Sequence, residues 1–242
     1  MADLTPPPTV HVFYRATGAL GEREIREAVA QLSADERARY ERFRFAPDRR
    51  DYAAAHALLR TALSRFVPVP PDAWRFREDP GGKPSLVADP RAPALSFSLS
   101  HTNGLVACAI TSGGDVGVDV EGVDRRVDAG LARRFFSESE NRALAACPTD
   151  AARTARFLEL WTLKEAYLKA IGVGLLHPLN TVIFTVDAGG RVRFSAPPGV
   201  DAARWRFRLF MPRPSYRLAV ALRLPPECGG EMACSIVDLS TP

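Results

Sequence analysis

Two apolar segments at the centre of the chain, 105–111 (LVACAIT) and 116–121 (VGVDVE), are separated only by the turn SGGD (112–115). Short runs rich in Val and Ile that are bounded by turn residues are typical of buried strands, and a short connection between two such runs predicts a β-hairpin. The turn also separates two stretches of similar composition. We therefore expect a hairpin at 105–121 and a join between two halves near residues 112–116.

Helical and strand patterns alternate on both sides of this join. In the first half, Ser33 with Glu36 forms a capping-box pattern, and the expected elements are a strand at 10–15, helices at 22–32, 33–43 and 49–66, and strands near 74–77 and 95–99. In the second half, Ser137 with Glu140 repeats that pattern. The elements expected there are a helix at 150–171 that ends at Gly172, a hairpin at 182–196, and strands at 205–210, 216–222 and 234–239.

This arrangement predicts an α+β fold in two parts, each a small antiparallel sheet with packed helices. The expected organisation is a flexible N-terminus at 1–9, an amino-terminal half at 10–112 and a carboxyl-terminal half at 113–242. A site in the cleft between the halves would be a natural location for chemistry.

Composition excludes several classes of protein. The 242 residues are 46% hydrophobic and 25% charged, and no apolar run approaches the ~20 residues of a membrane span. No secretory signal opens the sequence, and the four scattered cysteines predict reduced thiols in the cytoplasm. A net charge of +4 does not indicate nucleic-acid binding. Arginines crowd residues 37–50 and alternate over 204–208, which indicates either solvated faces or an anionic partner.

Two acids, Asp119 and Glu121, interrupt the second apolar strand and lie on one face of it, because side chains alternate along a strand. Two neighbouring carboxylates repel each other unless a cation lies between them. One interpretation is an exposed strand face whose acids pair with arginine. The other is a metal site, which needs at least one more oxygen ligand.

A third carboxylate is available in WTLKEAYLKAIGVGL (161–175), where Trp161, Glu165 and Lys169 lie along one helix face. Glu165 and Lys169 could simply form a surface ion pair. With Asp119 and Glu121, however, Glu165 would give Mg²⁺ three oxygen donors, and Mg²⁺ usually completes its shell with water and phosphate. Phosphate contacts could come from GGKP, which contains Lys83, and from LSHTN, which contains Ser100 and His101. Alternatively, Lys83 is an ordinary turn lysine and His101 a hydrogen-bonded structural histidine.

Taken together, G-V-D-V-E, W-x-x-K-E-A-Y-x-K-x-x-G-x-G-L, F-S-L-S-H and G-K-P resemble the motifs of the 4'-phosphopantetheinyl transferases. The chain is most similar to the large, monomeric, surfactin-type class, and the resemblance runs from about residue 35 to residue 179. It implies two similar halves in a pseudo-two-fold arrangement. It also implies transfer of the 4'-phosphopantetheine arm of coenzyme A to a carrier-protein serine, with release of adenosine 3',5'-bisphosphate.

Carried over residue by residue, the resemblance implies Mg²⁺, which Mn²⁺ could replace, held by Asp119, Glu121 and Glu165. Glu121 would ligate the ion directly or through water. The catalytic residues would be Glu165, Lys169 and His101, with Glu165 or a water as general base. The family's basic residue on the first helix falls on Arg39, while its second falls on Glu36, a departure. The coenzyme A contacts would be Arg39, Arg50, Lys83, Pro84, Ser100, His101 and Lys169.

The expected partners are coenzyme A and acyl, peptidyl or polyketide carrier domains, with neither nucleic acid nor membrane. We expect the carrier to dock at RRFFSESE (133–140), where arginines and phenylalanines would meet an acidic helix; alternatively, both phenylalanines belong to the core. Two other functions stay open. They are a non-catalytic module that binds coenzyme A or a carrier, and a Mg²⁺-dependent diphosphate hydrolase.

Overall fold

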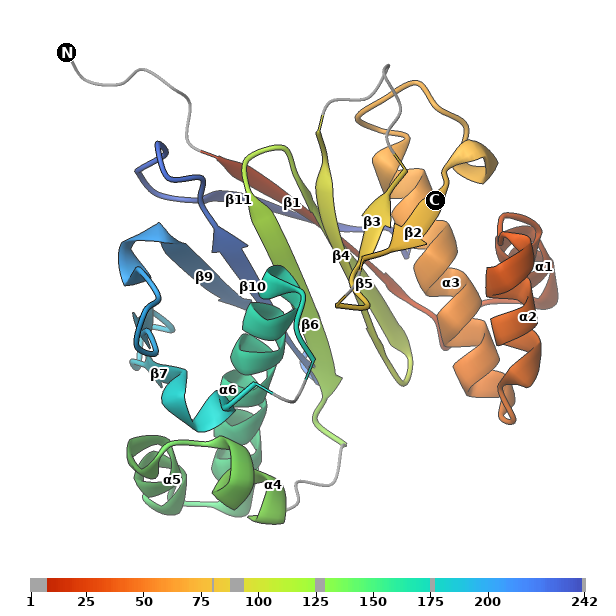
Figure 1. Ribbon diagram of the computed structural model, residues 1–242. Coiled ribbons are helices and arrows are strands. Elements are labelled where there is room, and N and C mark those ends of the chain that lie inside the picture. Colours follow the sequence, from red (N-terminus) through yellow and green to blue (C-terminus); the bar gives the residue numbers. More distant parts are fainter. Residues whose placement is uncertain (1–7, 80, 88–93, 125–128, 175–176, 241–242) are drawn as a thin grey trace.

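The computed structural model describes residues 8–79, 81–87, 94–124, 129–174 and 177–240 (Figure 1). Most of the expected flexible N-terminus at 1–9 lies outside these residues, and Thr9 already begins the first strand. None of the described helices has the length and apolarity needed to cross a membrane.

The elements follow the predicted order closely. The helices are α1 (Glu22–Ala30), α2 (Ala34–Arg42), α3 (Ala46–Leu63), α4 (Ala129–Phe135), α5 (Glu138–Ala145) and α6 (Asp150–Ile171). The strands are β1 (Thr9–Ala16), β2 (Phe76–Glu78), β3 (Pro84–Leu86), β4 (Ser96–Thr102), β5 (Leu105–Thr111), β6 (Asp115–Gly122), β7 (Ile183–Val186), β8 (Val192–Ser195), β9 (Trp205–Phe210), β10 (Tyr216–Arg223) and β11 (Ala233–Asp238). Both predicted capping boxes are present, and Gly172 ends α6 with a φ of 72°.

The strands form two main sheets, which confirms the α+β prediction but not the predicted central hairpin. One sheet has the order β11-β1-β5-β4 and the other β6-β10-β9, so β5 and β6 belong to different sheets. The connecting turn carries the chain from one sheet to the other. At Gly114, which has a φ of 133°, an added Cβ would lie 2.2 Å from the Arg223 carbonyl oxygen, so the turn packs directly against β10.

The prediction that the amino-terminal sheet is purely antiparallel is wrong. Strand β11, from the end of the chain, pairs with β1 in parallel, with Thr9 opposite Ala233 and Tyr14 opposite Asp238. The other pairings in this sheet, β1 with β5 and β4 with β5, are antiparallel. The last strand of the expected carboxyl-terminal half therefore completes the sheet of the amino-terminal half.

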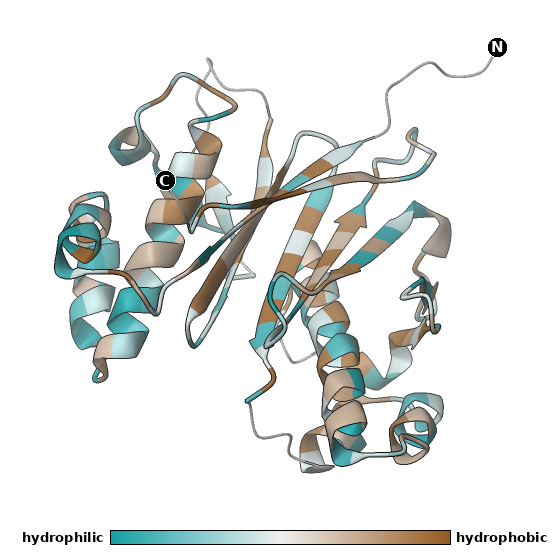
Figure 2. Cartoon of the chain, turned by 180° about the vertical axis from the view of Figure 1, so that it is seen from behind, coloured by the Kyte–Doolittle hydropathy of each residue, from teal (hydrophilic) through white to brown (hydrophobic). Residues whose placement is uncertain are grey.

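Side-chain alternation gives each sheet two apolar faces. One face of β6 and β10, with Val116, Val118 and Val220, packs against Val10 and Val12 of the other sheet. The opposite face of the β6-β10-β9 sheet is covered by α6, while α3 covers the outer face of the amino-terminal sheet. Figure 1 shows these two long helices on opposite flanks of the strands, and Figure 2 shows apolar residues along the strands from behind. Each half thus has its own helix-covered core.

Helix α6 packs against β6 at backbone distance, because Gly117 has no side chain. A Cβ built on Gly117 would lie 1.9 Å from the Ala166 carbonyl oxygen. Since Gly117, Asp119 and Glu121 share one face of the strand, this contact also points both acids toward α6.

We expect Gly117→Ala to destabilise the protein by about 1–3 kcal/mol or more, because backbone must move to admit the methyl group. Urea unfolding would measure the loss. Gly18→Ala is the control, since an added Cβ there meets nothing within 4 Å. Equal stability of the two variants would contradict this account of the α6–β6 contact.

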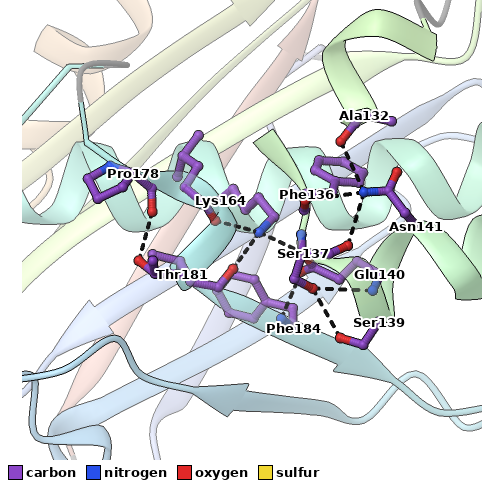
Figure 3. Close-up of polar contacts among 12 residues, drawn as sticks. Ala132, Phe136, Ser137, Ser139, Glu140, Asn141, Lys164, Pro178, Thr181 and Phe184 are labelled. Atoms are coloured by element: carbon purple, nitrogen blue, oxygen red, sulfur yellow. Dashed lines mark hydrogen bonds and ion pairs between the residues drawn. The ribbon is translucent and has the colours of Figure 1, made fainter. Parts of the chain in front are cut away.

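A buried ion pair fixes α5 and the segment after α6 (Figure 3). Lys164 is 0% exposed, and its ammonium lies 2.9 Å from Glu140 Oε2. The same ammonium donates to the carbonyls of Leu179, at 2.8 Å, and Val182. Glu140 in turn accepts the Phe184 amide at 2.9 Å. Both charges are therefore fully partnered, as buried charges must be.

Candidate active site

Asp119 is a buried carboxylate at the junction of the two halves. It projects from β6, is 6% exposed, and its Oδ1 accepts hydrogen bonds from Lys169 Nζ at 2.7 Å and Ser100 Oγ at 2.9 Å. Its second oxygen, Oδ2, is buried and has no hydrogen-bond partner among the described residues. A buried anionic oxygen of this kind calls for a donor or a cation.

Three separate elements meet at this carboxylate. Lys169 Nζ also donates to Ser100 Oγ at 2.8 Å, so the lysine, the serine and the aspartate form a closed triangle. Ser100 comes from β4 of the amino-terminal half, Asp119 from β6 and Lys169 from α6. The structure therefore brings three of the predicted site residues together.

His101 follows Ser100 on β4 and is exposed, and its side chain lies on the strand face opposite to that of Ser100. The protein packed around its ring lowers the pKa of His101, and the Lys169 ammonium lowers it further, while Asp51 opposes the shift. Asp51 is a buried residue that sequence reasoning missed. It accepts the Thr17 hydroxyl and, at 3.1 Å, the amide of Gly104 in the turn after β4. Asp51 thereby fixes the turn that follows His101.

Glu121 and Glu165 come from the same two elements as Asp119 and Lys169, β6 and α6. Glu121 shares the strand face of Asp119, and Glu165 is adjacent in sequence to Ala166, whose carbonyl contacts Gly117. Among the described residues, no three Asp, Glu, His or Cys side chains are arranged so that they could hold a metal ion. The ligand set Asp119, Glu121 and Glu165 thus remains a prediction.

Two family models match the chain. One, described as 4'-phosphopantetheinyl transferase, N-terminal, matches residues 21–112, and the other, the 4'-phosphopantetheinyl transferase superfamily, matches residues 115–221. A 4'-phosphopantetheinyl transferase of Bacillus subtilis is 30% identical over 202 residues, which cover 84% of this chain and 87% of the relative. The chain belongs to the 4'-phosphopantetheinyl transferase family.

Two other relatives, HetI and Sfp, have the same family name. The 4'-phosphopantetheinyl transferase HetI of Nostoc sp. is 37% identical over 155 residues, covering 64% of this chain and 65% of HetI. The 4'-phosphopantetheinyl transferase Sfp of Bacillus subtilis is 28% identical over 206 residues, covering 85% of this chain and 88% of Sfp. The chain is also similar to the crystal structure of holo-[acyl-carrier-protein] synthase from Thermotoga maritima. The match covers 46% of this chain and 64% of the synthase chain, at 26% identity and a TM-score of 0.38.

Lys83, a predicted coenzyme A contact, donates hydrogen bonds to two main-chain carbonyls of the carboxyl-terminal half. Its ammonium lies 2.9 Å from the Ala170 oxygen and 3.3 Å from the Val116 oxygen. Burial lowers the pKa of Lys83. Pro84, the next predicted contact, is exposed and begins β3. The structure therefore gives Lys83 an internal role that the family motif did not predict.

The family's second basic position, which falls on Glu36, is turned inward. Glu36 lies 2.9 Å from His56 Nδ1 and 2.6 Å from Arg60, so an acid here ties α2 to α3. Arg39, one turn later, is exposed, with its guanidinium 5.8 Å from the centre of the Tyr52 ring. Arg39 is thus free of that internal network and faces solvent.

This network predicts a pH dependence of stability. Burial favours the neutral acid, but the His56 and Ser33 hydrogen bonds and the charge of Arg60 hold the pKa of Glu36 at about 2, below its usual 4.5. Because the folded pKa is lowered, the stabilisation is complete above about pH 4.5 and is lost as the pH falls toward 2. The shift corresponds to about 3 kcal/mol. Relative to Glu36→Gln, the wild type should lose this advantage across that range in urea unfolding; parallel curves would contradict the assignment.

The remaining predicted contacts have mixed outcomes. Phe135 and Phe136 are buried, so the alternative that they belong to the core is correct, while Arg133 and Arg134 are exposed. Arg50, a predicted coenzyme A contact, lies 3.1 Å from Asp51.

Proposed function

We propose that this chain transfers the 4'-phosphopantetheine arm of coenzyme A to a serine of an acyl, peptidyl or polyketide carrier protein. The serine oxygen bonds to the phosphorus that carries the pantetheine, the bridging oxygen of the diphosphate is released from that phosphorus, and adenosine 3',5'-bisphosphate leaves. Family membership supports the reaction class. The observation that carries the proposal is the Asp119–Lys169–Ser100 triangle at the junction of the halves, built from the family's own motifs.

The charges of this triangle suit a diphosphate substrate. Phosphoryl transfer depends mainly on positioning and on neutralising charge at the phosphoryl oxygens. Lys169 is partly exposed and would contact the phosphates and stabilise the leaving group, and the exposed His101 would contact a phosphate as well. Glu165 is the proposed general base for the carrier serine, directly or through a water. These roles use groups from both halves of one chain.

The buried Asp119 Oδ2 fits a divalent cation, because it is an anionic oxygen with no donor among the described residues. We propose that Asp119 holds Mg²⁺, or Mn²⁺ in its place, with Glu121 on the same strand face and Glu165 on the facing helix as further ligands. A bound Mg²⁺ would neutralise charge on the diphosphate oxygens. Lys169 already takes the other carboxylate oxygen of Asp119, so the two cations would share one carboxylate.

The deciding experiment weighs a carrier protein after incubation with the enzyme, coenzyme A and Mg²⁺. We expect the carrier serine to gain one phosphopantetheine arm and adenosine 3',5'-bisphosphate to appear in equal amount. Release of free phosphopantetheine without modified carrier would indicate a diphosphate hydrolase. Binding of coenzyme A with no product would indicate a non-catalytic module.

Arg39 is proposed to bind the adenosine end of coenzyme A. We expect Arg39→Ala to raise the KM for coenzyme A by about tenfold with little change in kcat, because this contact is the same in ground and transition states. The test uses dephospho-coenzyme A, which lacks the 3'-phosphate, and the penalty should shrink with it if Arg39 binds that phosphate. An undiminished penalty would remove Arg39 from 3'-phosphate binding.

We further propose that the protein acts as a monomer in the cytoplasm. One chain supplies β4, β6 and α6, which carry the whole triangle, so the proposed site needs no second copy. All four cysteines are unpaired, as expected for a reducing compartment. Gel filtration with light scattering tests the oligomeric state, and a dimer mass would contradict the monomer.

A further inference from the structure

The two sheets meet through serine side chains. Strands β4 and β6 are neighbours in space but do not share a ladder. Instead Ser98 Oγ accepts the Val118 amide at 3.0 Å, and Ser100 Oγ accepts the Val120 amide at 3.3 Å. These two amides flank Asp119. The two serine hydroxyls therefore accept hydrogen bonds that carbonyls of a paired strand would otherwise accept. Both amides of β6 are thus hydrogen-bonded inside the core.

Lys83 makes a third contact between the halves, beside Lys169. Lys83 donates to the carbonyl of Ala170, the residue that follows Lys169, and to Val116 on β6. Beside it the β2–β3 turn touches the end of α6, where a Cβ on Gly81 would lie 2.2 Å from the Gly172 carbonyl oxygen. The amino-terminal half thus holds the backbone next to Asp119 with Ser98 and the backbone next to Lys169 with Lys83.

We propose that Ser98 and Lys83 are positioning residues, which fasten the amino-terminal half to β6 and α6 and so hold the Asp119–Lys169 pair in register with Ser100 and His101. This inference rests on the proposed transfer reaction. Neither residue needs to touch substrate in this role. Small displacements of reacting groups can lower the rate roughly 10²-fold. Contacts to the backbone one residue away from Asp119 and from Lys169 should therefore affect the rate.

Ser98→Ala tests the first contact. We expect the single-turnover rate of carrier modification to fall roughly 10- to 100-fold, with the KM for coenzyme A unchanged within about twofold. Hydrogen exchange of the Val118 amide should accelerate, because its acceptor is gone. Ser98→Thr, which keeps the hydroxyl, should restore both. The control is Thr111→Val: the Thr111 hydroxyl also accepts an amide, from Gly113 at 3.1 Å, but lies away from the site. That variant should lose stability and keep its rate.

Lys83→Met tests the second contact independently and serves if Ser98→Ala fails to fold. We expect its single-turnover rate to fall equally with coenzyme A and dephospho-coenzyme A, and KM to stay constant. A raised KM with an unchanged rate would overturn the positioning role of Lys83 and return it to coenzyme A binding. Faster Val118 exchange in Ser98→Ala without loss of rate would overturn the role of Ser98. An inactive wild type would instead refute the proposed function, since the exchange measurement needs no turnover.

Discussion

Lys164→Met should destabilise the protein by about 3–5 kcal/mol, because the variant leaves a buried carboxylate without its counter-charge. Glu140 is 2% exposed and would keep only its amide donors, Ser137 at 2.7 Å and Phe184 at 2.9 Å. The carbonyls of Leu179 and Val182 would lose a donor as well. Urea unfolding followed by circular dichroism measures the loss.

Two further variants show whether the loss of stability comes from leaving a buried charge unpaired or simply from breaking an ion pair. Lys164→Met combined with Glu140→Gln should recover part of the loss, because no uncompensated charge then remains in the core. Arg23→Ala breaks the Arg23–Glu27 pair on α1, whose side chains are 82% and 64% exposed, and should change stability little. A loss of less than about 1 kcal/mol in Lys164→Met would show that the Lys164–Glu140 pair does not hold α5 in place.

Asp119→Asn should lower the rate of carrier modification by at least about 10²-fold while the protein stays folded. The amide has the size of the carboxylate, so Ser100 can still donate to it, but the charge that pairs with Lys169 and would bind Mg²⁺ is lost. Mass spectrometry of the carrier gives the rate, and thermal unfolding reports the fold.

The matched control is Asp115→Asn on the same strand. Asp115 pairs with Arg223 at 2.6 Å, is partly exposed, and has no place in the proposed site. We expect this variant to retain its activity. If Asp119→Asn keeps most of its rate at saturating Mg²⁺, Asp119 is not the cation ligand. Isothermal titration of Mg²⁺ in the presence of coenzyme A would detect the loss of binding without turnover.

Elements set by local sequence signals were predictable. The predicted bounds of β5 and α6 match those observed, since an apolar pattern runs through each segment and Gly172 directly follows α6. The association of Asp119, Ser100 and Lys169 was also predictable in outline. Motifs far apart in sequence pointed to one site, although composition and spacing alone had left a surface ion pair open.

Features that depend on long-range pairing were not predictable. The apolar pattern of β6 is compatible with pairing to β5 or to β10, so the local sequence does not decide between them. In the folded chain β6 pairs with β10. Lys83 illustrates the same limit. The family resemblance implied a coenzyme A contact for this turn lysine, and only the folded chain reveals carbonyls of α6 and β6 within its reach. Asp51 gave no signal, because a single buried polar residue has no recognisable spacing. Ser98 belongs to F-S-L-S-H, but that motif assigned a role only to Ser100 and His101.

The parallel pairing of β1 with β11 has a consequence for how the protein is made. On the ribosome, strand β1 emerges well before its neighbour at 233–238, because most of the described fold separates the two strands in sequence. Until then one edge of β1 offers unpaired backbone groups, and exposed strand edges readily recruit other chains. The first sheet is therefore completed only after β11 has been synthesised, and closing a loop of this length is slow relative to local folding. Nascent and truncated chains that lack β11 should be the forms most in need of chaperones.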